Sequence, residues 1–499
     1  MPTRTTLIDE AQPADDAGMG LVEVLVAMLV FAIVAVSVAY SLTFTLTTTK
    51  NTKDREIAVN LAAEEIDEVR SIGNPFAVLS VPRPPSVPAR EQVVGGVRFT
   101  INRETSWVNE SGTDANCSAS GGTLRYKRIK VTVDWPGSGA GAAPAVSETL
   151  LAPASRINDA LKGTIFISVK GSNGAGLEGV TPTVSGTAAP AAEPTDAEGC
   201  SFVLGVTPGN YAVTIGGGFI DTTQASPSRV PVTGNLAVLA GQSTAFQFEV
   251  DRPGTFRTQY ATNRSVLANG TTTAIIFPPA LKTNFTSTLA PFTKAAQPVD
   301  TTGTIKTAEL TTSLFPTPAG YQAFAGDYTA SLPSQPGCEV SDPAAWAADV
   351  STGTTYIAQR GAGQSTTPSG TAAPIRVPMG IVQVTRAATS TGTSTRTYLL
   401  AIRQSGPVLA GQPGCVESSP QTIQFGQILP GTGAATIRIA LPFGSWKLWA
   451  TNTNTTSTSS NVTQLTSAAQ ATILSNVIPG RANADASGIL TVDPRGITP

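Results

Sequence analysis

Apolar and polar positions separate sharply near the N-terminus of the chain. A polar segment up to Asp16 gives way to an apolar stretch from Leu21 to about Leu46, and no charged residue lies between Val24 and Thr49. At 1.5 Å per residue, about 20 helical residues cross the roughly 30 Å hydrocarbon core of a membrane. The pattern therefore predicts a membrane-spanning helix.

Beyond this stretch the pattern becomes that of an amphipathic helix. Apolar residues recur at three-to-four spacing over residues 58–69, and acidic residues occupy most of the remaining face. Gly73 and Pro75 then end the pattern. We expect one continuous helix from Met19 to about Ile72, on the order of 80 Å long.

From residue 76 onward the pattern is that of short β-strands. Residues 97–101 and 126–135 alternate between apolar and polar, and past Ser155 short alternating segments are separated by Gly and Pro turns. Repeated short strands with such turns are typical of β-sandwiches. The expected fold class is α+β and mostly β: a long N-terminal helix, a small antiparallel sheet, and then a series of β-sandwich domains.

Composition narrows the function classes. The chain of 499 residues is long enough for several domains, its net charge is −2, and it contains no histidine. Without histidine, Ser-His-Asp and Cys-His catalysis and His-ligated metal sites are excluded. A two-carboxylate glycosidase needs no histidine, but no paired-acid motif is present. We expect a protein that is not an enzyme and uses no cofactor or metal.

The basic run Arg125, Lys127, Arg128 and Lys130 lies on one predicted strand. It fits a DNA-contacting stripe or the solvated side of that strand. We favour the solvated side, because no overall basic bias and no aromatic platform supports nucleic-acid binding.

Four cysteines are widely spaced, with no C-x-x-C pair, which fits one or two disulfides in an oxidising compartment. Three pairings are open. The segment Gln-Pro-Gly-Cys occurs twice, ending at Cys338 and Cys415, and this symmetry favours a bridge between them. Cys117 and Cys200 are then left to pair with each other or to stay unpaired.

Glu23 is a lone carboxylate near the start of the apolar stretch, and acids inside membrane spans are functional candidates. Together with Gly18 and Met19 it resembles the processing and methylation site of type IV prepilins. In that family a peptidase cuts after a Gly, the new N-terminal residue is N-methylated, and its fifth residue is a Glu. The resemblance implies cleavage after Gly18, methylation of Met19, and an assembly role for Glu23, which would meet the Met19 amine of a neighbouring subunit.

Two other interpretations account for part of this segment. A secretory signal peptide has an apolar core of 7–15 residues, which is shorter than the stretch here. An ordinary signal anchor fits the length but gives Glu23 no role. Lys50, Lys53 and Arg55 follow the span and would place the C-terminal part in the cytoplasm by the positive-inside rule. The cysteines and the Thr-rich β composition favour the outside, and we expect an extracytoplasmic C-terminal part.

Residues 160–250 resemble carboxypeptidase-regulatory, or transthyretin-like, modules. The resemblance rests on a strand followed by Gly176–Val180, Asp196–Gly199 and Pro208–Val213. It implies a non-catalytic spacer or binding module in which Tyr211 belongs to the core. Trp346, Trp446 and Trp449 fit sugar-stacking surfaces or buried positions, and the buried alternative is the commoner one.

These observations predict a minor pilin-like subunit of a type IV pilus, anchored in the cytoplasmic membrane before assembly and carried to the cell surface by the pilus. Its partners would be the prepilin peptidase/methylase, other pilin subunits and a surface glycan or protein bound by the β-domains, most simply at the fibre tip. The alternatives are a type II secretion minor pseudopilin and a single-pass surface adhesin outside any pilus. The expected segments are a leader (1–18), a helix (19–75), a pilin-like β-region (76–155), a transthyretin-like sandwich (156–252) and two further β-domains (253–378 and 379–499).

Overall fold

A computed structural model gives the fold of the chain. It describes residues 20–497 except 83–86, 110–111, 113, 116, 118–123, 137–142, 153–159, 187–189, 224–235, 264–273, 288–291, 296–307, 388–395, 417–419, 430, 432, 459–461 and 476–477. The chain forms two compact units, which are described separately below. The first comprises Met1–Ala115 and Arg125–Arg156, and the second comprises Asn116–Leu124 and Ile157–Pro499.

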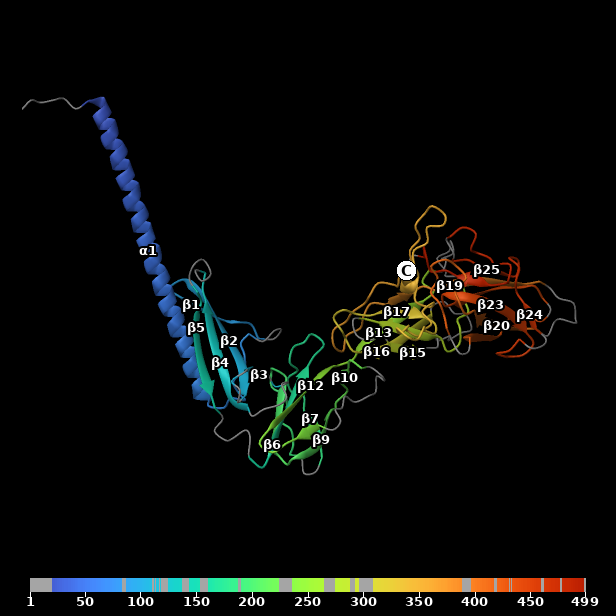
Figure 1. The fold of residues 1–499 in the computed structure, drawn as a ribbon, viewed down its shortest axis with the longest axis horizontal. Helices are drawn as coiled ribbons and strands as arrows, with labels where there is room; N and C mark the ends of the chain where they lie inside the picture. Colours follow the sequence, from blue (N-terminus) through green and yellow to red (C-terminus); the bar gives the residue numbers. More distant parts are fainter. Residues whose placement is uncertain are drawn as a thin grey trace, which may run out of the picture. The chain divides into compact units, whose positions relative to one another are not determined.

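One long helix, α1 (Leu21–Ile72), opens the first unit (Figure 1). It ends at Gly73, whose φ of 67° is the left-handed conformation that a helix C-terminus favours and that glycine adopts without steric cost. The end of the helix is where the sequence predicts it. Its apolar contacts to the rest of the unit lie on a single face of its second half, made by Ala58, Leu61, Ala62, Ile66 and Val69.

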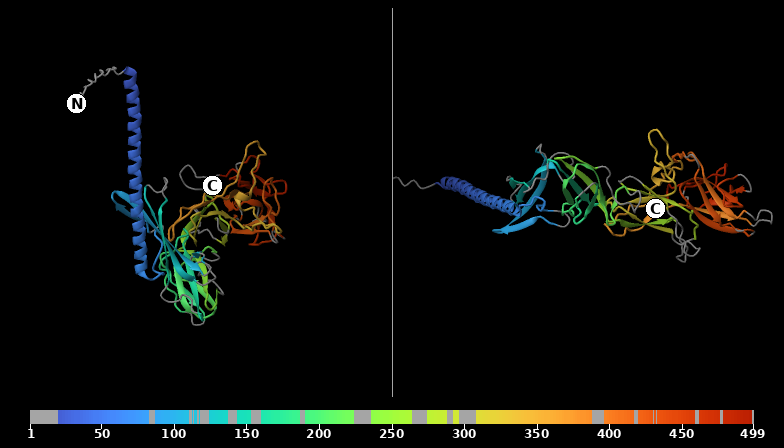
Figure 2. Two further views of the ribbon diagram at one scale, coloured as in Figure 1. Left: turned by 60° about the vertical axis from the view of Figure 1, so that its left-hand side comes forward. Right: turned by 90° about the horizontal axis from the view of Figure 1, so that it is seen from below.

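This face of α1 packs on an antiparallel sheet of order β1-β2-β4-β5, with β3 paired to β2 (Figure 2). Phe99, Ile129 and Val131 are fully buried beneath the helix, as the alternation of their strands predicts. The strands are β1 (Arg90–Val94), β2 (Val97–Asn109), β3 (Asp114–Ala115), β4 (Leu124–Asp134) and β5 (Ala145–Leu151).

The basic run on β4 differs from the prediction of a solvated face. Lys127 is buried, with 3% of its surface exposed. Its Nζ donates a hydrogen bond to the carbonyl of Val78 and lies 5.6 Å from the centre of the Trp107 ring. The expectation was wrong for Lys127 because these contacts compensate the burial of its charge. Lys130, on the other face, pairs with Glu104 at 3.5 Å.

The second unit begins with a β-sandwich of two sheets, ordered β10-β12-β6-β8 and β11-β9-β7, around one apolar core. Tyr211 belongs to this core, as predicted, and its hydroxyl donates to the carbonyl of Thr207 at 2.7 Å. The strands are β6 (Gly163–Lys170), β7 (Pro182–Ser185), β8 (Cys200–Val206), β9 (Gly209–Ile215), β10 (Ile220–Asp221), β11 (Leu236–Val238) and β12 (Ser243–Asp251).

A second group of strands forms the sheets β16-β13-β18 and β15-β14-β17 around a core that contains Phe256, Tyr260 and Phe285. A short 3-10 helix, η1 (Pro343–Ala345), lies in the long connection between β17 and β18. The strands are β13 (Gly254–Tyr260), β14 (Lys282–Thr286), β15 (Phe292–Ala295), β16 (Ala308–Leu314), β17 (Gln322–Ala325) and β18 (Ile375–Val377).

The third group forms the sheets β22-β19-β25 and β21-β20-β23-β24, with β26 paired to β23, around a core centred on Trp446. The strands are β19 (Gly380–Arg386), β20 (Tyr398–Arg403), β21 (Thr422–Gln427), β22 (Ala435–Leu441), β23 (Gly444–Thr451), β24 (Val462–Gln464), β25 (Ala471–Ile473) and β26 (Leu490–Val492). One long helix followed by antiparallel-rich sheets confirms the predicted fold class. The domain limits expected from the sequence stay predictions, because the chain divides into two units only and the second unit contains all three groups of strands.

Candidate functional site

The first turn of α1 carries the acidic residue that the sequence singles out. Gly20 is extended (φ −66°, ψ 144°), and its carbonyl accepts the N–H groups of Glu23 and Val24 at 2.9 and 3.2 Å. Glu23 is exposed in the first turn, where the positive end of the helix dipole favours a carboxylate. Gly18, Met19 and the rest of the 1–18 leader lie outside the described residues, so cleavage and methylation stay predictions.

The first half of α1 has no covering partner within the described chain. Every residue from 20 to 53 is exposed, including large apolar side chains such as Leu21 at 78% and Phe31 at 75%. The helix is long and apolar enough to span a membrane. A continuous apolar surface of this extent requires lipid or other helices.

Hydroxyl groups in this half are bonded to the helix itself. The hydroxyls of Ser37, Thr43, Thr45, Thr47 and Thr49 each donate to the carbonyl four residues earlier, at 2.8–2.9 Å. Such bonds satisfy a hydroxyl that would otherwise be costly in an apolar environment. The threonine-rich end of the apolar stretch is therefore compatible with lipid or helix contacts.

Two acidic residues in the second half of α1, Glu65 and Glu68, have a structural role that the sequence alone does not reveal. Glu65 is 4% exposed, and its two carboxylate oxygens accept hydrogen bonds from Arg103 and Arg90, each at 2.7 Å. Arg90 also donates to Glu68 at 2.6 Å, and that bond is the main cause of its raised pKa. These pairs fasten the helix to β1 and β2, so the acids are structural.

The structure brings the four cysteines together in two disulfides. Cys338 is bonded to Cys415, and Cys117 to Cys200. The first bridge joins the two Gln-Pro-Gly-Cys segments, which also form an antiparallel bridge at these residues. The other bridge attaches Cys117 to the start of β8, within the second unit.

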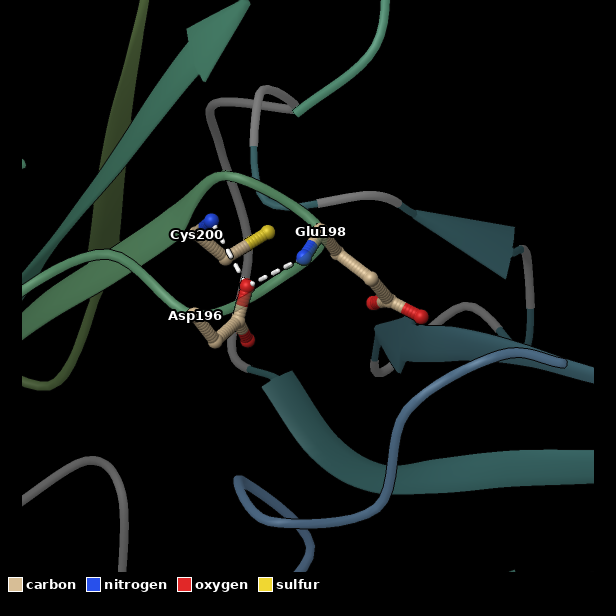
Figure 3. A group of neighbouring side chains, drawn as sticks. All are labelled: Asp196, Glu198 and Cys200. Carbon is tan, nitrogen blue, oxygen red and sulfur yellow. Dashed lines mark hydrogen bonds between the residues drawn. The ribbon is translucent and has the colours of Figure 1, made fainter. Parts of the chain in front are cut away.

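Asp196, Glu198 and Cys200 gather at the turn before β8 (Figure 3), with their ligand atoms within 4.8 Å of one another. The Cys200 sulfur is part of the disulfide to Cys117, so no thiolate is present there. Asp196 Oδ1 accepts the backbone N–H groups of Glu198 and Cys200, both at 2.9 Å. This arrangement caps a turn and positions Cys200; it does not form a metal site.

Gly199 makes the same turn possible. Its φ is +78°, and a Cβ atom there would lie 2.2 Å from the carbonyl oxygen of Val169. Only glycine fits both the conformation and the close approach. The Asp-x-x-Gly spacing noted in the sequence is therefore explained by turn geometry.

Two of the three tryptophans considered for sugar stacking are buried and offer no exposed ring surface. Trp346 and Trp446 are 4% and 0% exposed, and their indole N–H groups donate to the carbonyls of Val340 and Pro442 at 2.9 Å. Trp449 is half-buried. The sugar-stacking interpretation is wrong for Trp346 and Trp446, because both serve as core residues.

Comparison with known protein families finds a match to the N-terminal segment. Residues 14–39 match the model of the prokaryotic N-terminal methylation motif. No curated protein matches the chain.

Several solved structures are similar at low identity. The TIE protein of Bacillus anthracis has 12% identity, with 73% of this chain and 68% of that chain covered and a TM-score of 0.19. The major pilin subunit BcpA of Bacillus cereus has 13% identity, with 61% and 92% covered and a TM-score of 0.18. A streptococcal ancillary pilin has 11% identity, with 63% and 76% covered and a TM-score of 0.15.

With TM-scores this low, the structural similarities carry no argument about this chain. The methylation motif is informative about this chain, because it coincides with the start of a helix whose first half is apolar and is not covered by any described residue. The motif implies processing by a prepilin peptidase, membrane anchoring and assembly with other pilin subunits, and it supports a type IV pilin-like protein.

Proposed function

We propose that the chain is a minor pilin-like subunit of a type IV pilus, cleaved after Gly18 and N-methylated at Met19. The observation that supports this most directly is the methylation motif at residues 14–39, placed at the start of α1. The helix anchors the subunit in the cytoplasmic membrane and then enters the core of the fibre. The β-domains act as a binding array and perform no catalysis.

Glu23 is the assembly residue in this proposal. An unpaired carboxylate in an apolar environment is costly and favours a nearby cation. Cleavage after Gly18 creates such a cation, the ammonium group of Met19, on each subunit. Glu23 lies in the first turn of the helix, and its side chain has no partner among the described residues, so it is free to pair with the Met19 amine of a neighbour and set the axial register.

The extent of the β-rich part favours a position at the tip. In a fibre shaft, every subunit must pack laterally against its neighbours, which limits the size of its globular part. Here three groups of sheets follow the β1–β5 sheet. A subunit of this size is most easily accommodated where no further subunit lies above it, and the array there would contact a surface glycan or protein.

Mass spectrometry of the mature N-terminus tests the proposal. We expect the purified membrane or fibre form to begin with N-methyl-Met19. An intact N-terminus at Met1 would exclude prepilin processing and favour an ordinary signal anchor. Crosslinking then separates a pilus from a type II secretion system: recovery of secretion pseudopilins as the neighbouring subunits would contradict the pilus assignment.

A further inference from the structure

A polar cleft lies on the second group of strands, lined by residues of β13, β17 and β18 and of the segment between β17 and β18. It has a volume of about 720 Å³, within the range of small-ligand sites. Its lining is dominated by four carboxamides and two guanidinium groups, those of Gln259, Gln322, Gln359, Gln364, Arg360 and Arg376. A smaller hollow of about 300 Å³ continues it and shares Gln322 and Arg360.

The strands place these side chains on one face. Along β13 the burial alternates, so that Phe256, Thr258 and Tyr260 point into the core while Gln259 is half-exposed on the outer face. Gln259 is aligned with Arg376 of β18 in the parallel register. Neighbouring residues in register share a face of a sheet, so the amide and the guanidinium lie beside each other.

The segment 359–364, which also lines the cleft, is anchored at two points. Gly361 lies against β18 so closely that a Cβ atom there would be 2.1 Å from the carbonyl oxygen of Arg376. Three residues later, Gln364 exchanges two backbone hydrogen bonds with Tyr321, at 2.8 and 2.9 Å. The segment between them is thereby fixed to two sheets, and this reduces the entropy lost on binding a ligand.

Arg360 of the same segment is fixed by its hydrogen bonds. Its Nε and Nη2 donate to the two oxygens of Asp342 at 2.8 and 2.5 Å, and its Nη1 donates to Thr286 at 3.1 Å and to the Gln322 oxygen at 3.4 Å. The carboxylate of Asp342 neutralises it. Similarly, the Glu309 carboxylate accepts hydrogen bonds from Gln259 and from Arg257, two residues earlier on β13, each at 2.7 Å.

Arg376 is different, because it is exposed and makes no ion pair within the described part of the chain. The cleft thus presents about one uncompensated positive charge, surrounded by amides that can each donate and accept hydrogen bonds. This charge is too small for a polyanion such as DNA, whose binding depends on many phosphate contacts. The remaining lining residues are Ala and Pro, so no deep apolar pocket is available for a peptide side chain.

We propose that this cleft binds an acidic sugar, with Arg376 pairing with the sugar carboxylate and Gln259 and Gln359 bonding its hydroxyl groups. A planar guanidinium matches a carboxylate in two parallel hydrogen bonds, and carboxamides suit hydroxyl groups because they donate and accept from one side chain. An acidic sugar would then be the ligand class of the β-domains. The biological use of such binding rests on the proposed function.

Titration calorimetry on the full chain in detergent micelles tests the cleft. The probes are trigalacturonate, a hyaluronan tetrasaccharide and sialyllactose, each paired with its carboxylate methyl ester. We expect at least one acid to bind, and its ester to bind at least tenfold more weakly. Arg376→Gln should weaken binding of the acid at least tenfold, and Gln359→Ala by a smaller factor, both with unchanged circular dichroism.

Arg55→Gln is the matched control, because it removes an exposed arginine of α1 far along the chain from the cleft. It should leave binding unchanged. No binding of any of the three acids, equal binding of acid and ester, or full binding by Arg376→Gln would each overturn the proposal. Those results would leave the proposed function standing, since the mature N-terminus is measured independently of any sugar.

Discussion

Acidic residues of α1 differ in what surrounds them, and this difference assigns their roles. Glu65 and Glu68 bind arginines of the sheet, whereas Glu23 lies in the uncovered apolar half. In the second unit, Asp349 and Asp493 form ion pairs with Arg481, and Asp493 also pairs with the fully buried Arg495. A carboxylate that pairs with arginines of its own unit stabilises the fold. One without such partners, such as that of Glu23, can pair with a cation of another molecule.

Replacing Glu23 should affect assembly and not processing. We expect Glu23→Ala to be cleaved normally but to be at least tenfold depleted from sheared fibres, because the Met19 amine of the neighbouring subunit loses its counter-ion. Immunoblots of fibre and membrane fractions measure this. Glu56→Ala, an exposed acid farther along α1, is the control and should enter fibres normally. Equal incorporation of both variants would remove the assembly role of Glu23.

Asp349 should make the second unit sensitive to acid. Its pKa lies well below the ordinary value, mainly because the Ser351 hydroxyl and N–H donate to it at 2.6 and 2.8 Å, and also because Arg481 lies 2.5 Å away. A lowered pKa in the folded state adds stability above the unfolded-state pKa of about 4, and this stability is lost as the pH falls.

We therefore expect Asp349→Asn to reduce the free energy of unfolding by about 3 kcal/mol at pH 7, since the fully buried Arg495 and the partly buried Arg481 lose one of their counter-ions. The difference from the wild type should shrink at pH 3. Urea unfolding followed by tryptophan fluorescence at both pH values provides the measurement. Glu178→Gln changes an exposed carboxylate and should match the wild type at each pH. A loss that is the same at pH 3 and pH 7 would contradict the ionic explanation.

At the scale of elements, α1 consists of two halves with different environments on one continuous backbone. The first half exposes apolar side chains, and the second buries a narrow face against β2 and β5. The Glu65 pairs with Arg90 and Arg103 join this second half to the sheet. The sequence predicts both halves and the end at Gly73, because periodicity and helix stop signals are local.

Glu65→Gln should loosen the helix from the sheet. Arg103 has 12% of its side chain exposed and would lose its carboxylate, at a cost of about 3 kcal/mol. Hydrogen exchange of β2 and β5 amides should accelerate accordingly, with α1 still helical by circular dichroism. Glu64→Gln alters the adjacent exposed acid and should leave exchange unchanged. Unaltered protection in Glu65→Gln would show that apolar packing alone holds the helix.

For the whole molecule, the question is where a subunit with such a large β-rich part fits in a fibre. Its second unit contains three groups of sheets and both disulfides, and the cleft lined by Arg376 lies on the middle group. A binding array is most useful at an exposed fibre end, and this is also the position with the fewest lateral neighbours.

Immunogold labelling with antibodies against the second unit tests this position. We expect gold particles at one end of sheared fibres, at about one site per fibre, whereas an antibody against the abundant subunit labels the whole length. Even labelling along the shaft by the first antibody would place the chain among the ordinary fibre subunits and contradict the tip position.

The sequence by itself determined the features that depend on neighbouring residues. These include the apolar helix with Glu23 near its start, the change to an amphipathic face, the helix end, and the mostly β class of the remainder. Periodicity and turn residues act over a few positions and can be recognised without the fold. The core position of Tyr211 was also predictable, from the resemblance of its segment to a known module.

Only the tertiary structure decided the features that join distant parts of the chain. It buries Lys127 against Val78 and Trp107, places Trp346 and Trp446 in cores, and pairs Glu65 with Arg90 and Arg103. It also brings Gln259, Arg360 and Arg376 to one cleft from separate strands and a connecting segment. These contacts depend on strand order and register between segments far apart in the sequence, which no local pattern specifies.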